Sequence, residues 1–249
     1  MSYDPQTLRC LVIHLARAKQ RAANVEVLIR DLPCQTEVIS AVDGASDPAA
    51  IAGYYVRSLL SPRYPFALRP AEVATFLSHR KCWQYIVDQG LEAALIVEDD
   101  VALAEPTFRK ALSLAMDHLR QGDVIRFPIK PREVSTLDVA RSGDLHLFMP
   151  KEIGLGMQCQ IVSKEAAERL LSLTERFDRP VDTYLQLVWE HQVRILSVWP
   201  SGISEISEGL GGSLIGQRMS LGRKLRQEIL RPIYRARLRR RAKIWIGRD

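Results

Sequence analysis

The chain has 249 residues, of which 47% are apolar and 26% are charged, and its formal net charge is +6. This length and composition are typical of a folded α/β domain and exclude a chain that is disordered throughout. No segment approaches the roughly 18 uncharged apolar residues that a membrane-spanning helix needs, so we expect no transmembrane helix.

The four cysteines are far apart in the sequence: Cys10, Cys34, Cys82 and Cys159. They form no CxxC pair and no metal-knuckle spacing, so we expect four buried thiols in a reducing compartment. The first residues lack the basic and apolar regions of a secretory signal. We therefore expect a cytoplasmic protein.

The first third of the chain alternates between strand and helix patterns. Residues 8–15 form a short apolar run, residues 18–31 have helical spacing that ends before Pro33, and residues 36–42 form a second apolar run. Asp43-Gly44 marks a turn, and the proline-containing residues 45–69 are expected to form a surface loop. This alternation predicts a sheet that is covered by helices.

A long helix is predicted from Pro70 to Gly90, and a strand at 91–97 runs directly into three carboxylates. The remaining predictions are helices at 106–119, 164–174 and 180–190, strands at 123–127, 157–162 and 193–198, a loop and hairpin at 128–150, and a loop at 201–216. We therefore predict an α/β domain over residues 1–217 and a basic, helical extension over residues 218–249.

The three carboxylates are Glu98, Asp99 and Asp100. Alternate side chains at the end of a strand point the same way, so Glu98 and Asp100 are expected to share a face while Asp99 points to the other. Carboxylates bind hard divalent cations, often together with substrate phosphates. The triplet therefore predicts a metal site that also holds a diphosphate, with a solvated acidic turn as the alternative.

Residues 71–101 read AEVATFLSHRKCWQYIVDQGLEAALIVEDDV. Through Glu72, residues 76–80, Trp83 and the triplet, this segment resembles glycosyltransferase family 25, the family of bacterial lipooligosaccharide galactosyltransferases and collagen galactosyltransferases. Further matches follow the family's order along residues 10–217. They are the initial strand with Arg21, AVDG at 41–44, residues 156–171, PVD at 180–182 and SLI at 213–215.

The resemblance implies a GT-A fold, in which a Rossmann-like sheet that binds a nucleotide sugar is flanked by helices. It also implies Mn²⁺ or Mg²⁺ as cofactor, a UDP-sugar donor, typically UDP-galactose, and inverting transfer of a hexose. The acceptor would be a lipid-linked or oligosaccharide glycan such as a lipopolysaccharide core sugar. His14 stands where the family usually has asparagine, and Gln158 and Gln160 lie where an aromatic residue is common. These departures keep open a catalytically inactive, glycan- or nucleotide-binding relative.

Inverting transfer needs a carboxylate that removes a proton from the acceptor hydroxyl. Asp182, at the predicted start of a helix, is our first candidate for this base, and Glu205 and Glu208 are the reserves. Because free backbone N–H groups stabilise a carboxylate at a helix start, a simple capping role is the alternative for Asp182.

Further site residues are expected around the triplet. Arg80 falls within the apolar stripe of the 70–90 helix, where a buried guanidinium needs an anionic partner such as a diphosphate. We expect Arg80 and its neighbour His79 to act in catalysis, with structural roles as the alternative. The expected nucleotide contacts are Arg17, Arg21, Asp43, Arg80 and Asp99.

Basic residues dominate positions 218–248, where Glu228 is the single opposing carboxylate. Leu221, Leu225, Ile229 and Ile233 are spaced by four and predict an amphipathic helix. Such a helix is typical of binding to an anionic membrane surface, which would place the protein on the inner face of the cytoplasmic membrane. The alternatives are a helix packed on the domain or nucleic-acid binding, and since no recognition motif is present we do not expect nucleic acid.

Overall fold

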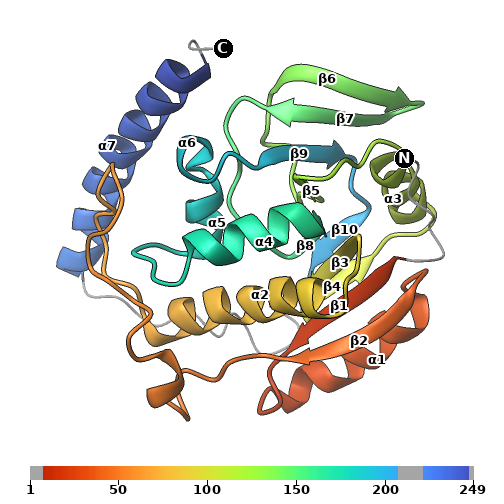
Figure 1. The fold of residues 1–249 in the computed structure, drawn as a ribbon, viewed down its shortest axis with the longest axis horizontal. Helices are drawn as coiled ribbons and strands as arrows, with labels where there is room; N and C mark the ends of the chain where they lie inside the picture. Colours follow the sequence, from red (N-terminus) through yellow and green to blue (C-terminus); the bar gives the residue numbers. More distant parts are fainter. Residues whose placement is uncertain (1–7, 207–220, 247–249) are drawn as a thin grey trace.

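The computed structural model describes residues 8–206 and 221–246. Its main layer is an eight-stranded sheet in the order β2-β1-β3-β8-β5-β9-β7-β6 (Figure 1). The strands are β1 (Arg9–His14), β2 (Gln35–Ser40), β3 (Ala93–Glu98), β5 (Asp123–Arg126), β6 (Ser135–Ser142), β7 (Leu145–Pro150), β8 (Cys159–Ser163) and β9 (Arg194–Trp199). The helices are α1 (Ala22–Asp31), α2 (Pro70–Asp88), α3 (Thr107–Asp117), α4 (Lys164–Leu173), α5 (Val181–Leu185), α6 (Val188–His191) and α7 (Leu221–Ile246).

Three parallel strands at one side of the sheet position the acidic triplet. β1 pairs with β2 and β3 in parallel, and Ile13 of β1 lies opposite Glu98 of β3. β8 runs antiparallel between β3 and β5, whereas β5 and β9 are parallel. The carboxyl ends of β1 and β3 therefore lie side by side, which brings His14 close to the triplet.

Alternating side chains of the buried strands divide the core into two layers. Cys10 and Val12 of β1 belong to the layer that packs on α1 and α3. Leu11 and Ile13 belong to the layer that packs on α2, α4 and α5. The strand period of two thus places helices on both faces of the sheet, and the predicted α/β class is confirmed.

The structure differs from the predicted elements at two places. The predicted loop at 201–216 contains a strand, β10 (Ile203–Glu205), which pairs with β4 (Val101–Leu103) just after the triplet. The predicted 180–190 helix is divided into α5 and α6. β10, α5 and α6 are only three to five residues long, so no hydrophobic period could reveal them. The hairpin expected within 128–150 is formed by β6 and β7.

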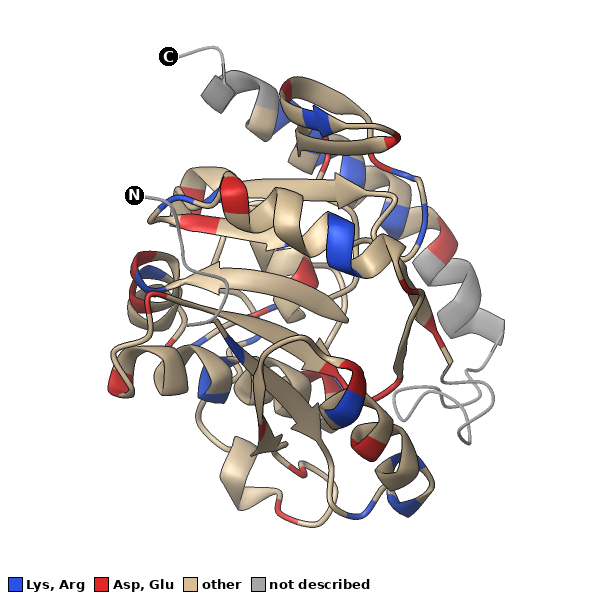
Figure 2. Cartoon of the chain, turned by 90° about the vertical axis from the view of Figure 1, so that its right-hand side faces the viewer, with Lys and Arg blue, Asp and Glu red and all other residues tan. Residues whose placement is uncertain are grey.

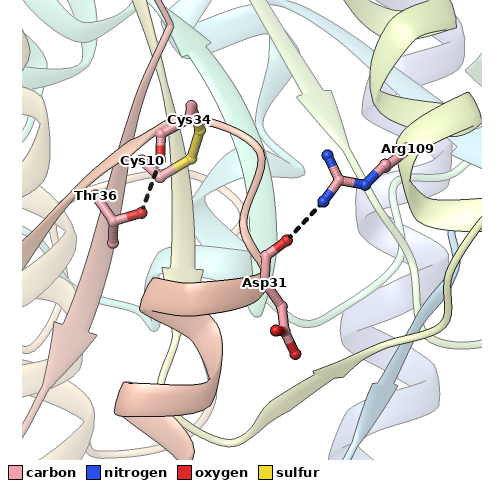
Figure 3. Close-up of a disulfide and its surroundings, with 5 residues drawn as sticks. All are labelled: Cys10, Asp31, Cys34, Thr36 and Arg109. Carbon is pink, nitrogen blue, oxygen red and sulfur yellow. Dashed lines mark hydrogen bonds between the residues drawn. A yellow bond between two sulfur atoms is a disulfide. The ribbon is translucent and has the colours of Figure 1, made fainter.

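Two of the cysteines are joined, contrary to the expectation of four thiols. Cys10 of β1 and Cys34, just before β2, form a disulfide with their Cα atoms 5.9 Å apart (Figure 3). Thr36 Oγ1 donates to the carbonyl of Cys34 beside it, at 3.1 Å. The pairing follows from the adjacency of β1 and β2, which sequence spacing does not disclose. Cys82 and Cys159 are buried thiols, as predicted.

The predicted basic extension is the helix α7, which packs on the domain beside α6 (Figure 1). Tyr234 and Leu238 are buried against Leu187, with Leu60, Tyr64 and Trp189 around them. Ile229 and Ile233 are 56% and 44% exposed. None of the helices in residues 8–206 and 221–246 combines the length and apolar character needed to cross a bilayer.

A buried ion pair ties α7 and a proline-containing loop to the domain. Asp178 and Arg179 have fully buried side chains 2.7 Å apart, and Arg179 Nη1 donates to the Tyr234 hydroxyl at 2.8 Å. Asp178 accepts the backbone N–H groups of Leu59 and Leu60, and Arg179 donates to carbonyls in the same loop. This network joins three segments that are far apart in the sequence.

We expect Arg179→Met to lower the free energy of unfolding by about 3–5 kcal/mol, because Asp178 would remain buried without its cation. Arg176→Met, which removes an exposed arginine three positions earlier, is the control and should change stability by under about 0.5 kcal/mol. Urea unfolding of both variants measures the difference. Equal stability of the two variants would show that the pair adds nothing to the fold.

Candidate functional site

A cleft with a cavity volume of about 520 Å³ opens at the carboxyl ends of β1 and β3. Its walls come from these strand ends, the first half of α2, the 155–158 loop, the start of α5 and one face of α7. All three triplet carboxylates line it. Ligands of open α/β sheets bind outside the carboxyl ends of the strands, and this cleft is in that place.

Asp99 is buried and bound on both carboxylate oxygens. Arg21 Nη1 lies 2.7 Å from Oδ1, and His14 Nδ1 lies 2.7 Å from Oδ2. Asn24 Nδ2 donates to the backbone carbonyls of Asp99 and Val101, which fixes the turn. Both oxygens of Asp99 hold Arg21 and His14 in place, and because Asp99 also lines the cleft, its contact with the donor stays a prediction.

Glu98 points toward α2, where it meets a buried histidine. His79 Nε2 lies 3.1 Å from Glu98 Oε1, and Gln160 Nε2 of β8 lies 3.4 Å from His79 Nδ1. With the Nδ1 atom accepting from the amide, the ring donates its Nε2 proton to Glu98. His79 is buried and lines the cleft, so its contact with Glu98 orients that carboxylate, and its catalytic role stays a prediction.

Asp100 has a buried carboxylate oxygen without a hydrogen-bond partner. Its Oδ2 lies 3.1 Å from Arg21 Nη1, whereas Oδ1 is buried without a hydrogen-bond partner. Burial, followed by the charge of Glu98, raises the pKa of Asp100 to about 6. A buried carboxylate oxygen beside a second carboxylate is an arrangement that a cation relieves.

The donor set fits a divalent cation only together with ligand oxygens. In the part of the chain that the structure describes, no three His, Cys, Asp or Glu side chains are grouped so that they could hold a metal ion. Mg²⁺-type ions are commonly held by one or two carboxylates plus substrate phosphates. Asp100 and Glu98 fit that pattern, and Arg21 balances part of their charge.

Asp43 and Arg17 form the rim beside β1 and β2. Asp43 Oδ2 accepts from Arg17 Nε at 2.6 Å, and Oδ1 accepts from the backbone N–H of Ala45 at 3.0 Å. A hydrogen bond from the Ser46 side chain has the largest effect on Asp43. Together with the bonds from Arg17 and Ala45, it lowers the pKa of Asp43 to about 2. Ser78 of α2 accepts the N–H of Val42 at 2.9 Å and so holds this rim against the helix. Both rim residues line the cleft, as expected for nucleotide contacts.

Asp182 lines the cleft from the start of α5. Its Oδ2 accepts the N–H of Gly156 at 3.1 Å, and its Oδ1 accepts the N–H of Thr183 at 2.6 Å. Gly156 has φ of +104°, a conformation that favours glycine. The 154–156 loop therefore holds the Asp182 carboxylate in a fixed position. This position is compatible with capping α5 and with accepting a proton.

A buried ion pair behind Asp182 supports this loop. Arg126 of β5 pairs with Glu133, and Arg126 Nη2 donates to the carbonyl of Gly156 at 3.0 Å. Glu133 also accepts the N–H of Gly154. Neither residue could be predicted from the sequence. Glu133 lies in a segment whose pattern indicates a loop, and a single arginine at the end of a strand belongs to no motif.

If the cleft catalyses transfer from a UDP-sugar, as the family resemblance implies, Glu133→Gln should lower kcat about tenfold while the affinity for UDP stays within twofold, because loosening the 154–156 loop displaces Asp182 and leaves the strand-end carboxylates in place. The unfolding free energy should fall by about 1–3 kcal/mol, since Arg126 loses a buried partner. Steady-state kinetics and calorimetry give the two values. Glu168→Gln, an exposed carboxylate on α4, is the control. An unchanged kcat in a destabilised variant would limit Glu133 to a structural role.

Arg80 is corrected as a site residue. Its Nη1 donates to the carbonyl of Leu171 at 2.9 Å and to the Thr174 hydroxyl, at the end of α4, and it does not line the cleft. The carbonyl of Leu171 and the hydroxyl of Thr174 accept the Arg80 hydrogen bonds that we had expected a diphosphate to accept. Glu205 lines the cleft from β10, while Glu208 lies outside the described residues.

The fold and the cleft define an α/β protein with a cavity at the carboxyl ends of its parallel strands. Residues 7–185 match the model of glycosyltransferase family 25, described as an LPS biosynthesis protein family. The chain therefore belongs to glycosyltransferase family 25, as the sequence resemblance indicated.

Individual relatives are distant and longer. Human procollagen galactosyltransferase 2 is 26% identical over 193 residues, which cover 72% of this chain and 30% of the relative. The mouse inactive glycosyltransferase 25 family member 3 is 27% identical over 208 residues, covering 76% of this chain and 35% of the relative. The chain thus spans about a third of the length of these curated relatives.

Two solved structures align with most of the chain at low similarity. A glycosyltransferase involved in glycosylation of the major capsid of PBCV-1 is 12% identical with a TM-score of 0.40, over 76% of this chain and 80% of that chain. Mannose-1-phosphate geranyltransferase from Thermus thermophilus is 13% identical with a TM-score of 0.37, over 77% of this chain and 73% of that chain. The assignment to the family rests on the family model.

Proposed function

We propose that the protein transfers a hexose from a nucleoside diphosphate sugar, with UDP-galactose as the expected donor, to a glycan acceptor with inversion. One observation carries the proposal: Asp100, with a buried partnerless oxygen, lies beside Glu98 and Arg21 in a cleft whose other wall bears Asp182. Family membership supports the donor class, and the description of the family supports a lipopolysaccharide-type acceptor.

Glu98 and Asp100 would hold Mn²⁺ or Mg²⁺ together with the donor diphosphate. When bound, the ion neutralises charge on the departing nucleoside diphosphate. Arg21 stays next to the same phosphates because Asp99 anchors it, and Arg17 lies at the rim with Asp43, where the nucleoside would bind. Arg17 and Arg21 thus replace Arg80 as the arginines nearest the expected leaving group.

Asp182 is the proposed base. As the acceptor oxygen bonds to the anomeric carbon, the bond from that carbon to the diphosphate oxygen breaks, and the hydroxyl proton passes to Asp182. The hydrogen bonds from Gly156 and Thr183 hold the carboxylate in place for this transfer. Attack from the face opposite the leaving group inverts the anomeric carbon.

For location we propose attachment to an anionic membrane surface through α7, with the inner face of the cytoplasmic membrane as the expected one. The Cys10–Cys34 disulfide removes the four-thiol argument for a reducing compartment, so the proposal rests on the charge of α7. Basic side chains recur along the described length of this helix (Figure 2). The exposed Ile229 and Ile233 provide apolar contacts beside them. Sedimentation with vesicles containing anionic lipid, compared with neutral vesicles, tests this attachment.

A catalytically inactive binding protein is the second candidate. Two observations favour it. Glu98 is paired with His79, and Asp99 is paired with His14 and Arg21. A similar mouse protein is named inactive glycosyltransferase 25 family member 3. The candidates predict different behaviour with nucleotide sugars. An inactive relative binds UDP or a glycan without releasing UDP from any UDP-sugar.

The test is UDP release from a panel of UDP-sugars, with and without Mn²⁺, in the presence of detergent-solubilised lipooligosaccharide. Mn²⁺-dependent release from one donor supports the transferase and identifies its sugar. UDP binding by calorimetry without any release would favour the inactive candidate. Neither binding nor release would overturn both.

A further inference from the structure

One face of α7 forms part of the cleft, although the family match ends at residue 185. Arg231, Tyr234 and Arg235 line the cavity. Residues three and four apart lie on the same side of a helix, so the three side chains form one row. The Arg179 hydrogen bond to the Tyr234 hydroxyl fixes that row relative to the domain.

The row continues into an aromatic wall. The rings of Tyr64 and Tyr234 meet edge to face with centroids 5.4 Å apart, and Tyr64 and Phe66 meet similarly at 5.5 Å. Arg231 Cζ lies 5.9 Å from the Phe66 ring centroid. All of these residues line the cleft. A wall with aromatic faces and polar edges is suited to a sugar ring, which has both apolar and hydroxyl-bearing surfaces.

The two arginines of this row differ from Arg239 and Arg241 of the same helix, which are paired with carboxylates. Arg239 lies 2.7 Å from Glu152, and Arg241 lies 3.9 Å from Glu190. Among the described residues no carboxylate lies within ion-pair distance of Arg231 or Arg235. Two guanidinium groups thus line the cavity, and neither is paired with a carboxylate of the residues that the structure describes.

The row lies at the end of the cleft that holds the proposed base. Arg179 donates to the Tyr234 hydroxyl at 2.8 Å and stands three residues before Asp182, at the start of α5. Asp182 and Tyr234 line the same cleft. The row of α7 therefore lies beside the proposed base, at the end of the cleft where the acceptor would bind.

We propose that Arg231 and Arg235 form a subsite for an oxyanion on the acceptor, so that the natural acceptor is a glycan bearing phosphate or carboxylate near the accepting sugar. Guanidinium groups bind both oxyanions through paired hydrogen bonds. The aromatic wall then holds the sugar ring that carries the charge. Calling the bound glycan an acceptor rests on the proposed function. The existence of an anion subsite depends on α7 alone.

Three hexoses serve as probes: glucose 6-phosphate, glucuronic acid and glucose, which carry a phosphate, a carboxylate and no charge. Binding to the full chain is followed by NMR titration in the presence of saturating UDP and Mn²⁺. We expect at least one anionic sugar to bind about tenfold or more tightly than glucose, as charge-assisted hydrogen bonds imply. Which of the two binds better identifies phosphate or carboxylate.

The double variant R231Q/R235Q should reduce the affinity for the anionic sugar to that for glucose. The control R237Q/R240Q removes the same charge from exposed positions of α7 that do not line the cleft, and should leave the preference intact. Equal binding of all three sugars to the unmodified protein, or equal loss in the two double variants, overturns the subsite.

UDP affinity separates this inference from the proposed function. R231Q/R235Q should bind UDP and Mn²⁺ as the unmodified protein does. A selective loss of UDP affinity would place the two arginines on the donor diphosphate and overturn the acceptor subsite. If the unmodified protein binds no UDP, the proposed function fails, and the sugar titrations, repeated without nucleotide, still decide whether α7 prefers an anion.

Discussion

Replacing Asp100 by asparagine is expected to lower kcat by about 10³-fold or more, because a metal-held diphosphate loses several kcal/mol of charge stabilisation with one ligand. Asp100 is the triplet member with a buried oxygen that has no hydrogen-bond partner. Asparagine keeps the shape and removes the charge that faces Glu98, so the fold should be retained. UDP release is measured over a range of Mn²⁺ concentrations, and circular dichroism follows unfolding.

Asp144→Asn is the matched control, because Asp144 is exposed and lies in the hairpin turn between β6 and β7. It should keep full activity and the same dependence on Mn²⁺. Turnover within threefold of normal in Asp100→Asn would remove Asp100 from the site. An unfolded Asp100→Asn protein would contradict the expectation that the charge serves the ligand rather than the fold.

Asp182→Asn is expected to lower kcat by about 10²–10⁴-fold, the usual contribution of a general base. The amide oxygen can still accept a backbone N–H, but the side chain no longer takes the acceptor proton. UDP affinity should be unchanged because the donor end of the cleft is untouched. Steady-state kinetics with the identified donor, together with UDP calorimetry, measures the two effects separately.

Glu205→Gln is the informative comparison for the base, since Glu205 lines the same cleft from β10. It should lower turnover far less than Asp182→Asn. If Glu205→Gln abolishes transfer while Asp182→Asn does not, Glu205 is the base and Asp182 is a cap for α5. A drop in UDP affinity in Asp182→Asn would instead place that residue on the donor.

Periodicity predicted the sheet and its longer helices because long buried elements carry a strong hydrophobic pattern. The triplet could be located at the end of β3 for the same reason, since an apolar run leads directly into Glu98. Short elements such as β4, β10 and α6 lack enough residues for a pattern. Their position depends on tertiary contacts that the sequence does not express locally.

The partners of the triplet were harder to predict than the triplet itself. His14 reaches Asp99 because β1 and β3 are adjacent with Ile13 opposite Glu98, which is a matter of sheet order. Arg80 and His79 are neighbours on α2, yet one points to the end of α4 and the other toward Glu98. A helical wheel predicts on which face of the helix a side chain lies, but not which residue of another element contacts it.

The docking of α7 has a consequence for how family members could be recombined. The helix reaches the cleft from outside the matched residues 7–185 and is held there by Tyr234 and Leu238. If the proposed anion subsite is correct, a chimaera that keeps Arg179 and the strand-end carboxylates but replaces α7 with the corresponding segment of another family member should retain its nucleotide binding and change its choice of glycan. The choice of acceptor would then be separable from the transfer chemistry.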